Sequence, residues 1–490
     1  MRHRRPGSSP RGRGAHVNDS YSTVLSRAGR ARDRRPLTPL FSVGYSAVLD
    51  PLTLITKRIL IALALAIHLV TVGSLLRQPL GVHQQAGVPR FLTWRLYHDS
   101  VRAWGPAADF FAVYHAGVNA KTGLSIYRQH ELHGGVTPYY YEYRYLPVLA
   151  YTFGRLVVML PPEAAYRAWI VTLEGLFWPV LLIVFRGLLH SRPGLVSWIA
   201  LVVATPFFLE LHMGQFTFAA AALLVLGTWM AGRGAAGRRP AWLAGSAAMV
   251  AASIVLKVFP TVTLVAWVRR RDYRVALAAI IGMVALLTVP GFVSNPTSYY
   301  DFRDANFIAL PGPGNFGFMY AMFLTLEHLG IVWSRQSWAT TITVTAVLLL
   351  GATALAVLGA RRRSLYAEAA VLLLAQFVAS YQVWEHHVSA ALLAGGLLML
   401  SILGRDTDLT ARDGSDADRV NNRYAWTLAC LLVLLALPTP YAIVDPNPRF
   451  WSFTDRMMVQ WSKALPTAGL YVLGLAWLLR RGVAWPWRHT

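Results

Sequence analysis

The feature that most constrains this chain is a series of long apolar segments, each long enough to cross a bilayer as a helix. Such a helix needs about 20 predominantly apolar residues, with about 17 as a practical minimum. The segments that meet this length are 59–76, 165–188, 195–211, 214–231, 275–292, 338–360, 364–381, 387–404, 424–443 and 465–481. Residues 146–160 and 241–268 are harder to assign, because prolines end the first and Lys257 and Pro260 interrupt the second. The pattern predicts an all-α, polytopic integral membrane protein of about twelve transmembrane helices.

The composition excludes most other classes of protein. Charged residues make up 14% of the 490 residues and hydrophobic residues 55%, whereas a soluble domain carries about 25% charged residues. A soluble enzyme, a disordered protein and a secreted disulfide scaffold are therefore excluded. The one cysteine, Cys430, lies in an apolar segment, which excludes a disulfide and a cysteine-based metal cluster.

The net charge of +23 is concentrated near the N-terminus and at the ends of apolar segments. Residues 1–57 are rich in Arg, Gly, Ser and Pro and lack apolar periodicity, so we expect a disordered basic arm. Basic residues beside a first membrane helix hold that end in the cytoplasm and attract anionic lipid head groups. Membrane lipids are thus expected partners, and nucleic acid is not. The first apolar segment begins too late and extends too far for a cleavable signal peptide.

Basic clusters orient the C-terminal half of the chain. Arg residues gather at 269–274, 361–363 and 480–488, which places those turns and both termini in the cytoplasm. The expected organisation is a membrane core at 58–404, a polar cytoplasmic loop at 405–423, and C-terminal membrane helices with a short basic tail at 424–490.

Two topologies remain open. In one, 146–160 and 241–268 each cross once, which leaves Arg233, Arg238 and Arg239 on the outside. In the other, 241–268 forms a re-entrant hairpin at Pro260 and 146–160 does not cross. Charge alone does not choose between them.

The loop at 77–145 follows the first span and is expected on the extracytoplasmic side. It is too long for a plain connector, and long loops of this kind are usually functional. It contains Asp109 within an apolar and aromatic run, and a later cluster that includes Glu142 and Arg144. The tyrosines could form an interfacial aromatic belt, but a carboxylate facing a membrane surface needs a partner or a purpose.

A second polar group, residues 380–387, lies between two confident spans on the same side. It contains Trp384, Glu385, His386 and His387. Adjacent histidines on one helix point about 100° apart, so they are poorly placed to chelate one metal. The group is either a plain polar loop or a place where histidine stabilises a phosphate-bearing donor beside an aspartate base. We expect no metal and no cofactor.

Three other elements could serve the same site. Gln215 lies between two spans and could belong to a simple helix turn. Lys257 lies inside an apolar segment, where a lysine is expected to be functional unless its side chain reaches an interface. In the hairpin topology it would reach the extracytoplasmic face and meet a phosphate. In the other topology it would lie toward the cytoplasm and have no special role. The loop that holds Arg303 and Asn315 could cover a substrate groove.

Taken in order, these motifs resemble a known family. Its opening signature is matched by Asp109-Phe110 with Tyr114 and Tyr127, and by the Tyr145/Pro147 pair. Gly214-Gln215, Lys257-Val258-Phe259-Pro260, Asn315 and Trp384-Glu385-His386-His387 follow in the same order. Across residues 95–400 the chain is similar to glycosyltransferase family 87, the polyprenyl-phosphate-mannose-dependent α-mannosyltransferases of the GT-C superfamily.

The resemblance implies a cell-envelope enzyme that transfers mannose from a polyprenyl-phosphate donor to a glycan or glycolipid acceptor on the extracytoplasmic face, with inversion. Asp109 matches the catalytic base, whose pKa should not be raised much if it is to stay ionised. His386 and His387 join it as catalytic candidates. The expected donor-phosphate ligands are Arg144, Lys257 and Arg303. The expected substrate-binding residues are Tyr114, Tyr127, Tyr145, Gln215, Asn315, Trp384 and Glu385.

Other functions compete with this interpretation. A lipid or solute transporter or flippase would also have many spans and buried charges, but transporters often carry paired broken helices, and only 257–260 is interrupted here. A membrane acyltransferase would use a histidine base, so substitution of Asp109 distinguishes it. A scaffold without catalysis is the remaining alternative.

Overall fold

The structure is a computed structural model that describes residues 51–77, 80, 106–128, 136–138, 140–237, 239–293, 297–307, 315–331, 334–405, 415–444, 450–480 and 482. The chain divides into two units, Met1–Leu54 and Ile55–Thr490. Most of the expected basic arm lies outside the described residues, but residues 51–57 are already helical. The expected polar loop at 405–423 is likewise shortened, because residues 415–423 form the start of a helix.

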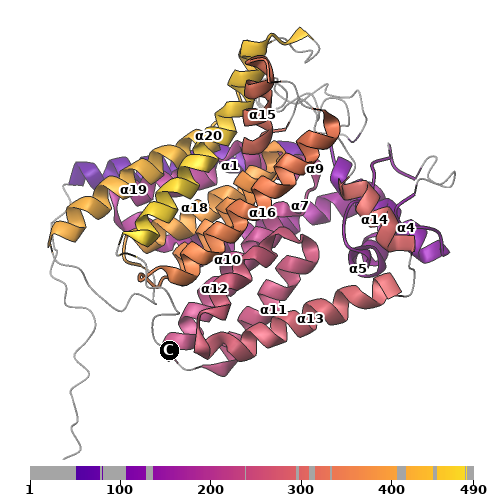
Figure 1. Cartoon of the computed structure of the whole chain (residues 1–490), viewed down its shortest axis with the longest axis horizontal. Coiled ribbons are helices and arrows are strands. Elements are labelled where there is room, and N and C mark those ends of the chain that lie inside the picture. The colour runs from indigo at the N-terminus through magenta and orange to yellow at the C-terminus, as the bar shows by residue number, and fades with distance from the viewer. Residues whose placement is uncertain are drawn as a thin grey trace, which may run out of the picture. The chain divides into compact units, whose positions relative to one another are not determined.

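The described chain is built from helices (Figure 1). Its one β-bridge joins Asn315 to Trp384. The main helices are α1 (Pro51–Arg77), α4 (Ala108–Thr122), α7 (Pro162–Pro179), α8 (Arg192–Val202), α9 (Thr205–Met213), α10 (Thr217–Gly237), α11 (Pro240–Leu256), α12 (Leu264–Val268), α13 (Arg274–Val293), α14 (Thr297–Phe307), α15 (Phe318–His328), α16 (Arg335–Gly359), α17 (Leu365–Ala379), α18 (Val388–Ile402), α19 (Ser415–Ala436) and α20 (Phe453–Leu479). Shorter elements are α5 (Pro147–Leu149), η2 (Ala150–Gly154), α6 (Arg155–Val157), η3 (Val180–Val184), η4 (Phe185–His190), η5 (Phe259–Thr263), η6 (Arg271–Tyr273), η7 (Glu385–His387) and η8 (Tyr441–Ile443).

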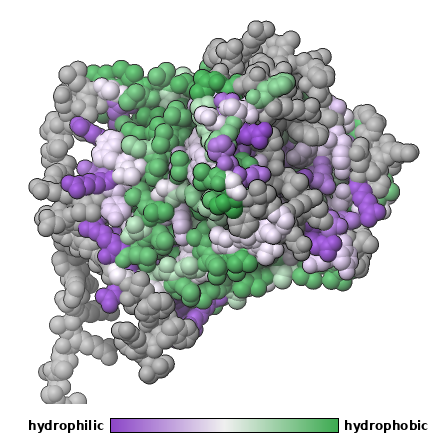
Figure 2. All heavy atoms as spheres, turned by 45° about the horizontal axis from the view of Figure 1, so that its top comes forward, coloured by the Kyte–Doolittle hydropathy of each residue, from purple (hydrophilic) through white to green (hydrophobic). Residues whose placement is uncertain are grey.

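Seven helical segments of the described chain are long and apolar enough to cross a membrane, and they make this a multi-pass membrane protein. They are 54–77, 162–190, 192–213, 271–293, 337–359, 385–402 and 453–479. The expected count of twelve is not confirmed. In Figure 2 apolar side chains form a band with hydrophilic side chains gathered on either side of it, as expected of helices that face lipid.

The spans differ in how they are covered. In the span that contains α18, 94% of the residues of its apolar stretch are buried. In the spans of α13 and α16 the corresponding shares are 11% and 17%. α18 contacts α17, α10, α19 and α8. α18 is therefore the centre of the helix assembly, and α13 and α16 present exposed apolar side chains such as Val275 and Leu348 to the surrounding lipid.

One end of the assembly is rich in arginine, and we call it the basic end. Here Arg269 donates 2.6 Å to the carbonyl of Val357 at the end of α16, and Tyr273 donates to that of Ala231 in α10. Lys57 donates 2.6 Å to the carbonyl of Leu189. The first two bonds place the ends of α10, α12 and α16 together. The start of α1 lies at the same end, because Gly187 of η4 lies against Leu400 and Arg405 at the end of α18, and Ser401 of α18 bonds Ser364 between α16 and α17. The opposite end of the helices, which holds the cavity described below, is called the cavity end.

Residues 240–268 form a hairpin whose two ends lie at the basic end. α11 runs antiparallel to α10, since Ser246 bonds the Gly227 carbonyl and Ser253 bonds that of Ala220. α11 ends at Lys257, which has extended backbone angles, and η5 and α12 then lead back to Arg269. This path agrees with the hairpin topology, with the reversal at Lys257–Val258 before Pro260, and it keeps the basic residues before α11 at the basic end.

The segment 146–160 stays at the cavity end. It forms three short helical pieces, α5, η2 and α6, of which η2 and α6 pack against α4. Gly117 of α4 touches the backbone of Gly154 so closely that a Cβ would lie 2.2 Å from the Gly154 carbonyl oxygen. Arg155 donates 2.6 Å to the Ala120 carbonyl. These contacts fix α4, and with it Asp109, on the rest of the molecule.

Candidate functional site

A cavity of about 640 Å³ lies at the cavity end, and we call it the central cavity. Its wall combines the start of α4, the loop after residue 140, the ends of α9, α11 and α17, one side of α16 and the turn before α18. Its polar and charged lining includes Asp109, Glu142, Arg144, Tyr145, Gln215, Lys257, Asn306, Gln376, Ser380, Tyr381, Gln382, Trp384, Glu385, His386 and His387. Residues from both expected polar groups therefore meet in one place.

Asp109 lies in the first turn of α4 and is buried. The helix is anchored there because the amide of Ala107, in a left-handed conformation at φ 66°, donates 2.8 Å to the His212 carbonyl. Gly214 lies against Phe110, where a Cβ would come within 2.6 Å of the Phe110 Cβ. A carboxylate at a helix N-terminus is favoured by the helix dipole. The fold thus holds the Asp109 carboxylate in a fixed position at the cavity wall.

Burial raises the pKa of Asp109 from its ordinary value of 3.8 to about 6, while the charges of Lys257 and Arg144 and a hydrogen bond from Gln215 oppose this rise. The expectation of a little-changed pKa is therefore not met, because the carboxylate loses more hydration than its neighbours replace. At neutral pH the group is still mostly ionised. A pKa near 6 suits a general base better than an ordinary carboxylate, since it binds a proton more readily.

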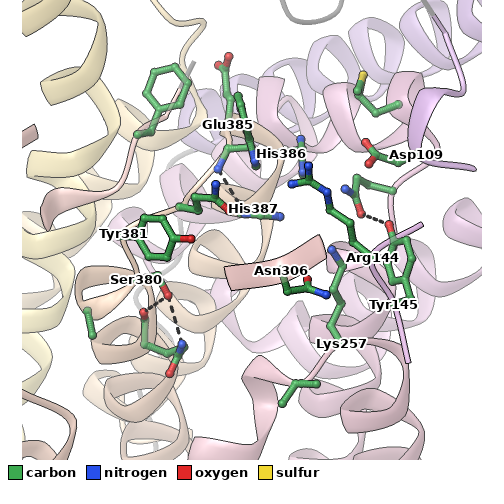
Figure 3. A pocket seen from close by; sticks show the side chains of 18 of the residues that line it. Asp109, Arg144, Tyr145, Lys257, Asn306, Ser380, Tyr381, Glu385, His386 and His387 are labelled. Carbon is green, nitrogen blue, oxygen red and sulfur yellow. Dashed lines mark hydrogen bonds between the residues drawn. The ribbon is translucent and has the colours of Figure 1, made fainter. Parts of the chain in front are cut away.

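Two cations face this carboxylate (Figure 3). Arg144 is held by Glu142, with Nε and Nη2 donating 3.1 and 2.9 Å to the same carboxylate oxygen. Lys257 directly follows the last residue of α11, and its ammonium lies 4.7 Å from the centre of the Tyr145 ring. The arrangement offers two positive charges beside a base, which suits the phosphate of a bound substrate.

The histidine pair lies across the cavity from Asp109 (Figure 3). His386 and His387 belong to the short helix η7, with ring centres 4.4 Å apart and an interplanar angle of 82°. Nδ1 of His387 accepts a hydrogen bond from the Trp384 amide at 3.2 Å. Nε2 of His386 is buried and has no hydrogen-bond partner among the described residues, so it can bind a substrate group. No cluster of metal-ligating side chains occurs in the described part of the chain.

Four of the predicted site residues lie outside the cavity wall. Asn315 is fully buried and bonds the backbone of Gly317, Tyr381 and Val383, so it shapes the turn before α18. The hydroxyls of Tyr114 and Tyr127 donate to the carbonyls of Leu160 and Tyr145. Arg303 is half exposed and pairs with Asp304 at 2.8 Å. These residues support the fold or its surface, and the structure gives none of them direct access to a substrate in the central cavity.

The structure also adds residues that the motifs did not indicate. Gln376 of α17 lines the cavity and lies in a stretch with no motif, and Asn306 of α14, in the loop expected to cover a substrate groove, lines it as well. Glu210 of α9 is fully buried behind the cavity and accepts a hydrogen bond from the Phe218 amide at the start of α10. It interacts electrostatically with Lys257 and Asp109. A lone carboxylate in an apolar segment is a functional signal, and it could have been found in the sequence at 195–211.

One wall of the cavity is apolar and faces lipid. It is formed by Ile342, Ala346, Val347 and Leu350 on α16 and by Leu256 and Val258. Val347 is 65% exposed and Val258 52% exposed on the outer surface of the helices. A cavity with a charged centre and a lipid-facing apolar wall accommodates an amphipathic molecule whose tail stays in the bilayer.

A helical membrane protein with a buried carboxylate, two cations and a lipid-facing wall in one cavity has the features of an enzyme acting on a lipid-linked substrate. The sequence model of glycosyltransferase family 87 matches residues 143–383. The match covers slightly less than half of the chain, and this part of the chain is similar to a family of glycosyltransferases. It includes Arg144, Tyr145, Gln215 and Lys257, whereas Asp109 and the histidine pair lie outside the matched residues.

No protein of curated function matches the sequence. Two similar solved structures are those of ArnT from Cupriavidus metallidurans, one bound to undecaprenyl phosphate and one in the apo state. The first is 14% identical and has a TM-score of 0.36 over 87% of this chain and 77% of that chain. The second is 14% identical and has a TM-score of 0.34 over 86% and 77%.

Proposed function

We propose that this protein transfers a sugar, mannose by family resemblance, from a polyprenyl-phosphate donor to a hydroxyl of an envelope glycan or glycolipid. The observation that carries the proposal is the meeting of Asp109, Arg144 and Lys257 in one cavity whose apolar wall opens to lipid. A soluble donor would need no such wall. A binding protein would need no carboxylate with a pKa moved toward neutrality beside cations.

Asp109 acts as the general base. It removes the proton from the acceptor hydroxyl as that oxygen attacks the anomeric carbon of the donor sugar. The bond between this carbon and the phosphate oxygen breaks, and its electron pair leaves with the polyprenyl phosphate. Attack opposite the leaving group inverts the anomeric centre, so a β-linked mannosyl phosphate yields an α-mannoside. The proton ends on Asp109 and passes to solvent.

Arg144 and Lys257 stabilise the leaving phosphate. Negative charge grows on this group as the glycosidic bond breaks, and fixed cations in a partly dehydrated cavity lower the energy of that state. In the free protein Glu142 binds Arg144, and a phosphate would compete with Glu142 for the guanidinium. His386 lines the cavity, and its Nε2 has no hydrogen-bond partner among the described residues, so it is a candidate to bind a further oxygen of the sugar or phosphate.

The donor's prenyl chain lies along α16 and the reaction takes place on the extracytoplasmic side. α11 has 17 residues, so its end at Lys257 lies about 25 Å from the basic end, close to the full thickness of about 30 Å of a hydrocarbon core. The positive-inside rule assigns the arginine-rich basic end to the cytoplasm. The cavity end then faces outward, in the plasma membrane, near the outer interface.

The test is sugar transfer by the purified protein in nanodiscs, supplied with polyprenyl-phosphate-mannose and a lipid-extract pool of acceptors. We expect transfer by the wild type and almost none by Asp109→Asn, which keeps the size of the side chain and removes the base. Binding of polyprenyl phosphate should persist in this variant, which shows that the cavity is intact.

Two outcomes would contradict the proposal in different ways. Binding of polyprenyl phosphate without transfer of any polyprenyl-linked sugar would favour a lipid transporter. Equal transfer by the wild type and Asp109→Asn would retain a glycosyltransferase and reject Asp109 as its base.

A further inference from the structure

Lys463 is a buried lysine within the apolar helix α20 and lies outside the family match. Its side chain is 1% exposed. Leu479, the last residue of α20, lies sixteen residue steps after Lys463, and the Gly482 carbonyl just beyond it accepts from the Arg361 amide at the basic end. Lys463 therefore lies about 24 Å from the basic end, at the depth of Lys257. A charged group at this depth in a membrane helix is energetically costly and is usually retained for a function.

The ammonium of Lys463 joins the C-terminal helices to the central cavity. It donates hydrogen bonds to the carbonyls of Leu435, at 2.8 Å, and Leu437, at the end of α19. It also lies 4.0 Å from the carboxylate of Glu385. Glu385 in turn accepts a 2.6 Å hydrogen bond from the Thr439 hydroxyl. The cation thus neutralises free carbonyls at a helix end and faces an acidic residue of the cavity wall.

The second carboxylate oxygen of Glu385 is also buried. This oxygen, Oε2, has no hydrogen-bond partner among the described residues, and the residue belongs to the cavity lining and to the same short helix as His386 and His387. A buried carboxylate keeps its charge only with a nearby cation. Lys463 is the cation that approaches it in the part of the chain that the structure describes.

The charges of the cavity explain why this pairing matters for an anionic donor. The acidic residues in the described lining are Asp109, Glu142 and Glu385, and the Lys and Arg residues are Arg144 and Lys257. The lining therefore carries one more negative charge than positive charge before any phosphate enters. Lys463, one layer behind the wall, places a positive charge 4.0 Å from Glu385 and so offsets the charge of that carboxylate.

We propose that Lys463 is a positioning residue for the donor site: it balances the charge of Glu385 so that the cavity admits a phosphate, and it holds the turn Glu385–His387 against the end of α19. The inference rests on the proposed function for the identity of the donor. It gives α19 and α20 a direct part in the active site.

Three variants test this role. Lys463→Met removes the charge and keeps most of the side-chain volume. Lys463→Met/Glu385→Gln removes both charges and restores the balance. Lys57→Met is the matched control, since Lys57 also donates to a helix-end carbonyl but lies at the basic end. Each is compared with the wild type for donor KM, kcat, Kd for polyprenyl phosphate and thermal unfolding in nanodiscs.

We expect Lys463→Met to raise donor KM and Kd at least about tenfold, with a smaller change in kcat, because an unpaired buried carboxylate repels the phosphate. The double variant should recover most of the affinity for polyprenyl phosphate that Lys463→Met loses, measured as Kd. Lys57→Met should leave donor KM and Kd unchanged. An unchanged donor affinity in folded Lys463→Met would overturn the inference, as would a weak affinity that Glu385→Gln fails to restore.

The binding measurement separates this inference from the proposed function. If the wild type binds polyprenyl phosphate but transfers no sugar, the proposed function fails and the role of Lys463 in phosphate binding is still tested by Kd. If Lys463→Met does not fold, the double variant decides in the same way. Failure of both to fold, with Lys57→Met folded, would show that Lys463 serves the fold and would reject a role in the donor site.

Discussion

The hydroxyl of Tyr145 donates a 2.8 Å hydrogen bond to Oε1 of Gln215, and this bond fixes which way the Gln215 amide faces. The same oxygen also accepts from the Phe216 amide at 2.9 Å. The nitrogen of the amide is then left to donate to Asp109, where it lowers the pKa of the carboxylate. Tyr145 therefore influences the pKa of Asp109 through Gln215, and its ring contacts the Lys257 ammonium.

The first prediction concerns the pH dependence of transfer. Because Asp109 must be ionised and has a pKa of about 6, kcat/KM of the wild type should fall by about tenfold for each pH unit below that value. Tyr145→Phe keeps the ring beside Lys257 but frees Gln215 to rotate. The pKa of Asp109 should then rise, and the acidic limb of the kcat/KM–pH profile should move to higher pH. An acidic limb at the same pH in both proteins would contradict this coupling.

The second prediction concerns stability. The folded-state pKa of Asp109 lies above its ordinary value, so stability present with the protonated group is lost as the pH rises through about 6. The difference between 3.8 and 6 corresponds to about 3 kcal/mol. Asp109→Asn should therefore raise the Tm of the protein in nanodiscs at pH 7.5, and the gain should shrink toward zero at pH 4. A lower Tm at both pH values would show that the carboxylate has a structural role.

The third prediction separates the cavity arginine from the exposed one. Arg144→Gln removes a cation beside Asp109 and leaves Glu142 unpaired in the cavity. Both effects disfavour phosphate, so Kd for polyprenyl phosphate should rise by about 10- to 100-fold. Arg303→Gln, on the half-exposed pair with Asp304, should change it by less than about twofold. Equal losses in the two variants would return Arg303 to the donor site.

The fourth prediction concerns the apolar wall. Ala346 lines the cavity on α16, and Leu348 of the same helix is 66% exposed and lies outside the lining. Ala346→Trp should fill the space for the prenyl chain and reduce kcat/KM for a long-chain donor by at least about tenfold, with little effect on a short-chain, water-soluble donor. Leu348→Trp should affect neither. A similar loss with both donors in Ala346→Trp would place the chain elsewhere.

The helical segments could be predicted because a membrane imposes length and hydropathy on them. The apolar segments recur as helices in the structure, including α1, α7, α13 and α16. The path of 241–268 could not be predicted, because its direction depends on contacts that hydropathy does not contain. Ser246, Ser253 and Arg269 fix the hairpin by bonds to distant carbonyls.

The part of the candidate site that could be predicted consists of ionisable residues within apolar segments of the sequence. Asp109, Lys257 and the histidine pair stand out in the sequence for this reason, and the structure brings them to one cavity. From the sequence alone, Asn315 and Tyr127 cannot be told from substrate-binding residues, but in the structure their side chains form hydrogen bonds with buried backbone groups. Such a role depends on which carbonyl or amide lies within reach, and this is decided by the tertiary fold.

The short apolar wall of the central cavity has a consequence for the donors that the protein can use. From Ile342 to Leu350 the wall covers eight residue steps of α16, or about 12 Å. This length grips only the part of a polyprenyl chain next to the phosphate, and the remainder lies among the acyl chains of the bilayer. The protein should therefore require a minimum chain length and discriminate little between longer carriers, so that cells with carriers of different size could use the same enzyme.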